Sequence, residues 1–266
     1  MMKLMNLMGA AIAAVLLTTA ASQAQTVEDI KARGKVLIAM DLGSPPYAFP
    51  DANQQPQGSD IETAKLLAED MGVELEIVPT NGQGRIPSLL SKKADLVIAT
   101  FSYTPERAKT VAFSDPYSFT RSVIFAEKGA QISSLDDLVG KKTGVARGTT
   151  PDTQLGKLLP QGAEIVRYDD DATTIAALAS GQIDALGTAD NRFLTLEERF
   201  PGRFEIKYEV DQYYLGIGLR LGNPELLAYL NNWVETNMEN GKLQAIYEKW
   251  LKQPLPKLPK LSEIGG

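Results

Sequence analysis

Residues 99–117 contain the side chains of this chain that are best placed to do chemistry. Thr104 stands where the N-cap of a short helix belongs, and Pro105 takes the first helical position. Arg107 therefore falls in the first turn, where the helix dipole is positive and disfavours a cation. Hydroxyls, open N–H groups and a guanidinium fork together suit the binding of a carboxylate. The alternative is an Arg on a solvated first turn, paired with Glu106 or with a distant acid.

A second candidate anion site follows an expected strand at residues 143–146. The sequence Gly148-Thr149-Thr150 opens an expected helix that runs to Leu159. A turn of this kind directs several N–H groups to one point and forms an anion-binding nest. The alternative is an ordinary helix N-cap at the two threonines. The run at residues 169–171, three aspartates before another expected helix, is interpreted as a solvated helix start with a cap.

Composition excludes several classes of protein. The chain has 266 residues with no Cys and no His, and its 33 acidic and 27 basic residues give a net charge of −6. Disulfides, thiolate catalysis and Ser-His nucleophiles are therefore excluded, and the commonest metal ligands are missing. An acidic chain without a basic run is a poor candidate for binding nucleic acid. No phosphate loop or dinucleotide turn is found, so we expect no cofactor and no metal.

The first 24 residues have the pattern of a secretory signal peptide. Lys3 precedes an apolar run at residues 7–17, and Ser22-Gln23-Ala24 fits a cleavage site, so residues 1–24 are expected to be removed. The apolar run is too short to predict a transmembrane anchor. Because the chain has no Cys that could carry a lipid, an outer membrane is the simplest means of retaining it, and we expect a periplasmic protein.

Expected strands alternate with expected helices along the rest of the chain, which predicts an α/β fold built from two units. Ser59 and Asp60 are expected to cap a helix that ends at Gly72, and residues 254–259 are expected to lie extended on the surface. The expected strands lie at residues 36–40, 74–78, 96–99, 123–126, 143–146, 165–166, 183–186, 204–208 and 214–219.

Six short motifs, in order along nearly the whole mature chain, give a specific resemblance. The chain resembles the periplasmic amino-acid-binding proteins of family 3, the soluble components of ATP-driven importers for polar amino acids. The motifs are Pro45-Pro46-Tyr47, Thr104-Pro105-Glu106-Arg107, Phe113-Ser114-Asp115-Pro116-Tyr117, Asp137-Leu138-Val139-Gly140-Lys141, Gly148-Thr149-Thr150 and Gly181-Gln182-Ile183-Asp184-Ala185.

The resemblance implies a two-lobed periplasmic binding protein fold of type II, which closes on its ligand. Residues 25–119 and 214–266 would form the first lobe, and residues 120–213 would form the second. Two chain crossings would join the lobes, and a ligand would bind in the cleft between them.

The resemblance also implies roles for residues at both sides of the cleft. Arg107 would hold the ligand α-carboxylate, and Thr100 and Ser102 would add hydroxyl and backbone contacts. Backbone N–H groups of the loop at Gly148, Thr149 and Thr150 would hold the same carboxylate from the second lobe.

Two aromatic residues and an acid complete the implied site. Tyr47 would stack on the ligand side chain and Phe101 would form another wall, with the alternative that both belong to the core. The family places an Asp for the ligand ammonium five residues after Asp184, where this chain has Ala189. Asp190 follows directly and is expected to take this role, because a buried ammonium without a carboxylate is costly.

Arg85 is similar to an Arg that reaches ligand side chains in binders of acidic amino acids. Asp41 stands where those binders have a second cation. Asp41 could neutralise Arg85, or it could contact a basic ligand. A purely structural Arg85–Asp41 pair is therefore the alternative to a ligand contact.

We expect a monomeric, non-catalytic binding protein that captures a polar or charged amino acid and delivers it to the membrane permease subunits of an ABC importer. One alternative is an enzyme similar to the periplasmic cyclohexadienyl dehydratases, which act on prephenate or arogenate. The displaced acid at Asp190 keeps that alternative open, whereas the intact Arg107 motif speaks against it. A receptor domain that signals to a membrane kinase or chemoreceptor is a third possibility.

Overall fold

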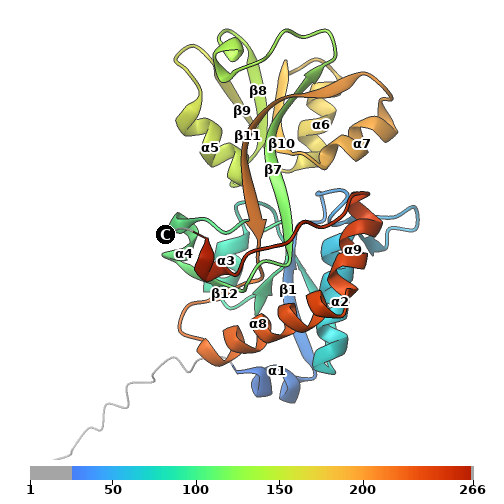
Figure 1. Cartoon of the computed structure of the whole chain (residues 1–266), viewed down its shortest axis with the longest axis vertical. Coiled ribbons are helices and arrows are strands. Elements are labelled where there is room, and N and C mark those ends of the chain that lie inside the picture. The colour runs from blue at the N-terminus through green and yellow to red at the C-terminus, as the bar shows by residue number, and fades with distance from the viewer. Residues whose placement is uncertain (1–25, 265–266) are drawn as a thin grey trace, which may run out of the picture.

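The structure, a computed structural model, describes residues 26–264 and consists of two lobes, each built on a five-stranded sheet. In Figure 1 one lobe lies above the other, and two long strands run between them. The α/β class and the two-lobed architecture expected from the sequence are confirmed. The predicted signal peptide lies outside the described residues. No helix within residues 26–264 is long and apolar enough to cross a membrane.

The first lobe, the lower one in Figure 1, contains a sheet with the strand order β4-β1-β5-β12-β6. The strands β4, β1 and β5 are parallel, as the alternation of strands and helices predicts, and β12 runs antiparallel to both of its neighbours. The strands are β1 (Lys35–Met40), β4 (Glu74–Pro79), β5 (Leu96–Val97), β6 (Val111–Phe113) and β12 (Gly218–Arg220), and a separate hairpin pairs β2 (Phe49–Pro50) with β3 (Pro56–Gln57).

Helices cover this sheet and bury its apolar side chains. Ile38 and Leu96 have no exposed surface. They belong to one core cluster with Leu67, from the helix at Ser59–Met71, and Leu230, from the helix at Pro224–Glu239. The helices of this lobe are α1 (Val27–Arg33), α2 (Ser59–Met71), α3 (Arg85–Leu90), α4 (Pro105–Ala108), α8 (Pro224–Glu239) and α9 (Lys242–Leu251).

The predicted cap of α2 is wrong. The N-cap is Gly58, which makes no side-chain cap, and Ser59 and Asp60 belong to the first turn of the helix. The Asp60 carboxylate instead accepts hydrogen bonds from the Thr100 backbone, 2.7 Å away, and from the Tyr117 hydroxyl, 2.9 Å away. A distant partner therefore outcompetes the local cap, which sequence spacing cannot reveal.

The second lobe contains a sheet with the strand order β11-β7-β10-β8-β9. In it β10, β8 and β9 are parallel, and β7 is antiparallel to both of its neighbours. The strands are β7 (Ser118–Glu127), β8 (Lys142–Ala146), β9 (Glu164–Tyr168), β10 (Ala185–Ala189) and β11 (Phe204–Leu215). The helices are α5 (Thr150–Leu158), α6 (Asp171–Ala179) and α7 (Arg192–Arg199), and a 3₁₀ turn, η1 (Leu135–Leu138), lies between β7 and β8.

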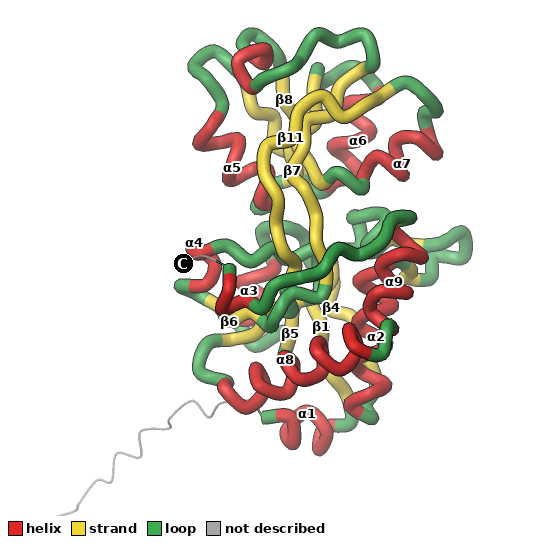
Figure 2. Tube along the Cα trace, in the orientation of Figure 1, coloured by secondary structure: helices red, strands yellow, loops and turns green. Residues whose placement is uncertain are grey.

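The long strands β7 and β11 pair with each other and connect the lobes, as Figure 2 shows. The two strands predicted at residues 204–208 and 214–219 are wrong in their limits, because β11 is continuous to Leu215 and a break separates it from β12. The polar residues 209–213 resemble a loop in sequence, but β7 supplies their strand partners, with two register irregularities. The predicted lobe limits at residues 119–120 and 213–214 fall within this strand pair and stay predictions.

The segment after α9 crosses the first lobe towards α4 (Figure 1). Leu255 packs into the core of that lobe, and the Leu261 N–H donates to the Asp115 carboxylate at 2.7 Å. A short 3₁₀ turn, η2 (Leu261–Glu263), ends the described chain. The segment is extended as expected, and its contacts hold it on the lobe that contains α1.

Phe125 of β7 is completely buried in the second lobe, so Phe125→Ala is expected to remove about 3–5 kcal/mol from the free energy of unfolding. Phe193 is 37% exposed, and Phe193→Ala, the matched control, is expected to change it by less than about 0.5 kcal/mol. Chemical denaturation followed by circular dichroism measures both. Equal losses in the two variants would contradict the burial described here.

Candidate functional site

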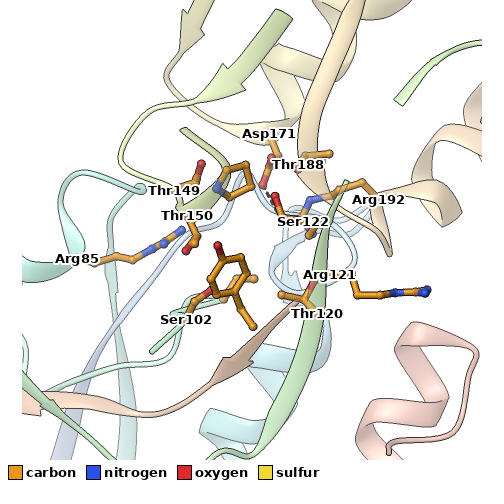
Figure 3. Close-up of a pocket in the computed structure, with 14 residues that line it drawn as sticks. Arg85, Ser102, Thr120, Arg121, Ser122, Thr149, Thr150, Asp171, Thr188 and Arg192 are labelled. Carbon is orange, nitrogen blue, oxygen red and sulfur yellow. Dashed lines mark hydrogen bonds and ion pairs between the residues drawn. The ribbon is translucent and has the colours of Figure 1, made fainter. Parts of the chain in front are cut away.

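A pocket of about 400 Å³, counted to its open mouth, lies between the lobes. Its walls come from the end of β5, from α3 and from the starts of α5, α6 and α7, together with the crossing strands (Figure 3). Most of its lining side chains carry hydroxyl or charged groups. The lining residues are Arg85, Thr100, Ser102, Thr120, Arg121, Ser122, Thr149, Thr150, Pro151, Asp171, Thr188, Ala189, Arg192 and Tyr213.

Arg107 lies at the edge of this pocket and connects the lobes. Thr104 caps α4 and Pro105 occupies its first turn, as predicted. The guanidinium donates from Nη1 to the Ser102 carbonyl at 2.9 Å and to Thr150 Oγ1 at 3.1 Å, and from Nη2 to the Gly148 carbonyl at 3.0 Å. Both hydroxyl-bearing partners, Ser102 and Thr150, line the pocket.

No carboxylate of the described residues lies within ion-pair distance of Arg107, and Glu106 pairs instead with Lys109. The pKa of Arg107 is lowered to about 9, first by burial and then by the like charge of Arg85. A partly buried cation without an acidic partner favours the approach of an anion.

The turn at Gly148 is only partly available as an anion nest. The Gly148 N–H donates to the Asp152 carboxylate at 2.9 Å, and the Thr149 N–H donates to the Ala146 carbonyl at 3.4 Å. Thr149 is the N-cap of α5, so the alternative interpretation of an ordinary cap also describes this turn. Thr149 and Thr150 both line the pocket (Figure 3), but the Thr149 hydroxyl donates to the Ala146 carbonyl at 2.7 Å.

Arg85 points into the pocket from the first lobe, as Figure 3 shows, and is 3% exposed. Its Nη2 lies 3.8 Å from Asp41 Oδ2, and its buried Nε has no hydrogen-bond partner in the described structure. Burial lowers the pKa of Arg85 and raises that of Asp41, and each charge opposes the shift of the other. The predicted Arg85–Asp41 contact is therefore present but long, and it leaves donor capacity for a ligand.

The two predicted aromatic walls are core residues that lie beneath guanidinium groups. Phe101 is 1% exposed, packs on Phe113, and lies 5.1 Å from the guanidinium carbon of Arg107. Tyr47 is fully buried, with its ring centroid 4.8 Å from the guanidinium carbon of Arg192. Neither Phe101 nor Tyr47 is among the described lining residues, which matches the core alternative.

Asp190 is directed away from the pocket. Its Oδ2 accepts from Nε of Arg121 at 2.8 Å, and its Oδ1 accepts from the Thr120 hydroxyl and the Arg121 backbone, each at 3.2 Å. Arg121 extends away from the other labelled side chains in Figure 3. At the pocket surface β10 contributes Thr188 and Ala189 instead. The carboxylate of Asp190 is thus occupied by a strand of its own lobe.

The sequence interpretation missed two charged residues of the pocket, Asp171 and Arg192. Asp170 caps α6 as the three aspartates predict, but Asp171 is 7% exposed, so the expectation of a solvated run is wrong at this position. Asp171 Oδ2 accepts from Nη2 of Arg192 at 2.6 Å. Only the aspartate run signalled the acid, and no local pattern signalled the Arg.

Arg192 also reaches across the cleft to the first lobe. It is 1% exposed, and it donates to the Pro45 carbonyl at 2.7 Å and to Ser44 Oγ at 2.6 Å. The neighbouring Asn191 amide bonds to the Tyr47 hydroxyl. Together with Arg107, these contacts hold the two lobes against each other.

Residues 26–264 contain no group of three or more His, Cys, Asp or Glu residues placed to hold a metal ion. The arrangement can bind a small polar molecule through guanidinium and hydroxyl groups.

The lobes touch where the backbones of Gly82 and Arg147 meet. A Cβ atom at position 82 would lie 2.2 Å from the Arg147 carbonyl oxygen, so Gly82→Ala is expected to hold the lobes apart. Gly129→Ala is the control, because nothing lies within 4 Å of its Cβ position. Small-angle X-ray scattering should give a larger radius of gyration for Gly82→Ala alone. An unchanged radius would show that this contact does not limit closure.

Comparison with known proteins identifies the relatives of this chain. Residues 36–253 match the family of bacterial extracellular solute-binding proteins, family 3. The L-cystine-binding protein TcyJ of Escherichia coli (strain K12) is 32% identical over 250 residues, which cover 93% of this chain and 94% of that protein.

Solved structures agree with this match. The solute receptor for L-cysteine of Neisseria gonorrhoeae has a TM-score of 0.80 and 32% identity, covering 85% of this chain and 94% of the receptor. The ancestral amino acid-binding protein AncCDT-1, a precursor of cyclohexadienyl dehydratase, has a TM-score of 0.79 and 34% identity, covering 85% and 99%. With a family match over most of its length, the chain belongs to family 3 of the bacterial extracellular solute-binding proteins.

Proposed function

We propose that this protein captures an amino acid in the cleft between its lobes and delivers it to an ABC importer. The observation that carries the proposal is a cation without an acidic partner at the pocket edge. Arg107 has no ion-pair partner among the described residues, and it bonds to Ser102 and Thr150 of the pocket wall. A ligand carboxylate beside these groups would supply the missing negative charge.

The same geometry supports roles for the other predicted site residues. Ser102 and Thr150 line the pocket and can bond to the ligand carboxylate beside Arg107. Thr100 and Thr149 line it as well, but their hydroxyls donate to Asp60 and to the Ala146 carbonyl. Arg85, with its unpartnered Nε, is placed to meet a polar or acidic side chain of the ligand. Gly148 contributes through the carbonyl that orients Arg107.

A thermal-shift screen tests this function directly. Amino acids with polar, acidic, basic and sulfur-containing side chains are each added to the full mature protein. A ligand at a hundred times its dissociation constant adds about 2.7 kcal/mol to the free energy of unfolding, which raises the melting temperature measurably. Absence of a shift with every amino acid would overturn the proposal.

Arg107→Ala is expected to weaken binding of the amino acid found in that screen by at least about thirtyfold, equal to about 2 kcal/mol, because a charge-assisted bond to its carboxylate is lost. Lys109→Ala is the matched control, since Lys109 is exposed and pairs only with Glu106 among the described residues. Isothermal titration calorimetry measures both dissociation constants. Equal affinities of parent and Arg107→Ala would contradict the assigned role.

A dehydratase is the second candidate, and the likeness to AncCDT-1 favours testing it. The pocket provides an argument against it, because the acid in its described lining, Asp171, is bonded to Arg192 and has a lowered pKa. Burial raises that pKa, but the charge and hydrogen bond of Arg192, the hydrogen bond of Thr188 and the charge of Arg85 together more than offset the effect of burial. Such a carboxyl is a poor proton donor at neutral pH. Phenylpyruvate release from prephenate, followed by absorbance, would establish the enzyme if it occurred and is expected to be absent.

The proposed setting is the periplasm, reached through cleavage after Ala24, with the protein acting as a monomer. The match to extracellular solute-binding proteins supports secretion. Mass spectrometry of the protein from a periplasmic extract tests the cleavage site, and light scattering tests the monomer.

A further inference from the structure

Asp171 is the one carboxylate among the described residues that line the pocket. Its Oδ1 accepts a single hydrogen bond, from Thr188 Oγ1 at 2.8 Å. Its Oδ2 accepts from Arg192 at 2.6 Å and from Ser44 Oγ at 3.3 Å. Each carboxylate oxygen can accept two bonds, so Oδ1 retains one acceptor position.

Ser122 of β7 adds a second acceptor beside this carboxylate. It is 2% exposed, lines the pocket, and its buried Oγ has no hydrogen-bond partner in the described structure. Its backbone is the strand partner of Ala189, so the hydroxyl lies next to the position where β10 offers only a methyl group. Asp171 lines the same pocket, and both residues are labelled in Figure 3.

Asp171 and Asp190 each have an arginine partner, and Arg85 also acts on Asp171, but of these two acids only Asp171 is among the described lining residues of the pocket. Arg121 bonds to Asp190 through its side chain and its backbone, and Thr120 occupies Asp190 as well. The positive charge of Arg192 is shared among Asp171, Ser44 and Pro45 and is packed on the Tyr47 ring.

From this geometry we infer that the α-ammonium of the ligand binds between Oδ1 of Asp171 and Oγ of Ser122. Asp171 therefore determines the preference of the pocket for amino acids over acids that lack the amino group. The ammonium donates one N–H to each of these oxygens, and Thr188 orients the carboxylate. Asp190 acts only as a positioning residue that holds Arg121 and β7. This inference rests on the proposed function, because it requires an amino acid in the cleft.

Paired probes separate the ammonium from the rest of the ligand. Each amino acid is compared with its deaminated analogue by calorimetry on the mature protein: L-glutamate with glutarate, L-aspartate with succinate, L-cysteine with mercaptopropionate, L-cystine with dithiodipropionate, and L-arginine with guanidinopentanoate. We expect the parent to prefer the bound amino acid over its analogue by about tenfold to a hundredfold, as for a hydrogen bond between charged groups.

In Asp171→Asn this preference is expected to fall to about threefold or less, while the affinity for the deaminated analogue stays near that of the parent. Binding of the analogue also shows that the variant is folded, although Arg192 loses its ion pair. Ser122→Ala leaves the Asp171–Arg192 pair intact and is expected to reduce the preference by about threefold to tenfold. Asp190→Asn, the matched acid, is expected to keep the preference of the parent even if both affinities fall.

Retention of the full preference in Asp171→Asn, or its loss in Asp190→Asn alone, would overturn the assignment while leaving the proposed function intact. Failure of the parent to bind any of the amino acids would overturn the proposed function and this inference with it. If Asp171→Asn bound neither member of any pair, Ser122→Ala would decide: an unchanged preference there would also overturn the assignment.

Discussion

The buried Arg192 guanidinium imposes the constraint on which the cleft depends. A charge that is 1% exposed needs a counter-charge and hydrogen-bond acceptors, because removal from water costs several kcal/mol. Its own lobe supplies Asp171, but Ser44 and the Pro45 carbonyl come from the other lobe. Nη1 and Nη2 therefore keep all of these partners only while the lobes are in contact, and the buried Nε has no hydrogen-bond partner in the described structure. Arg192 thus links the closure of the molecule to the shape of the pocket.

Arg107 and Arg85, in contrast to Arg192, lack a closely bonded carboxylate among the described residues. Arg107 reaches across the cleft to the Gly148 carbonyl, and Arg85 has a distant contact with Asp41, but neither has a well-bonded carboxylate in the described structure. Neutral carbonyls and hydroxyls compensate a cation less well than an acid does. An anion is therefore stabilised most where these two side chains approach the pocket.

The glycines at the lobe contact make this arrangement possible. Gly82 lies against the Arg147 carbonyl, and Gly43 lies against the Asp170 side chain, at separations that a Cβ atom would violate. Close backbone approach brings the hydroxyls of α5 and the strand ends of the first lobe to opposite sides of one small space. Binding and closure are in this way coupled through steric fit as well as through charge.

Sequence alone determined the features that depend on neighbours along the chain. The alternation of strands and helices, the cap at Thr104 and Pro105, and the position of Arg107 in a first turn all follow from local rules, and the ordered motifs predicted the family and its two-lobed fold. Tertiary structure decided what depends on distant partners. The Asp60 carboxylate bonds to Thr100 and Tyr117 and does not form the predicted cap. Residues 209–213 are strand because they pair with β7.

The local sequence pattern also could not predict the orientation of the Asp190 and Asp171 side chains. The Asp190 carboxylate accepts a hydrogen bond from Arg121. Asp171 belongs to an aspartate run expected to be solvated, but it lines the pocket and accepts a hydrogen bond from Arg192. Each choice is set by the partner that best compensates a buried charge, and that partner lies 69 residues away for Asp190 and 21 residues away for Asp171. Spacing along the chain contains no information on such pairs, because only the packed fold decides which charges share a low-dielectric interior.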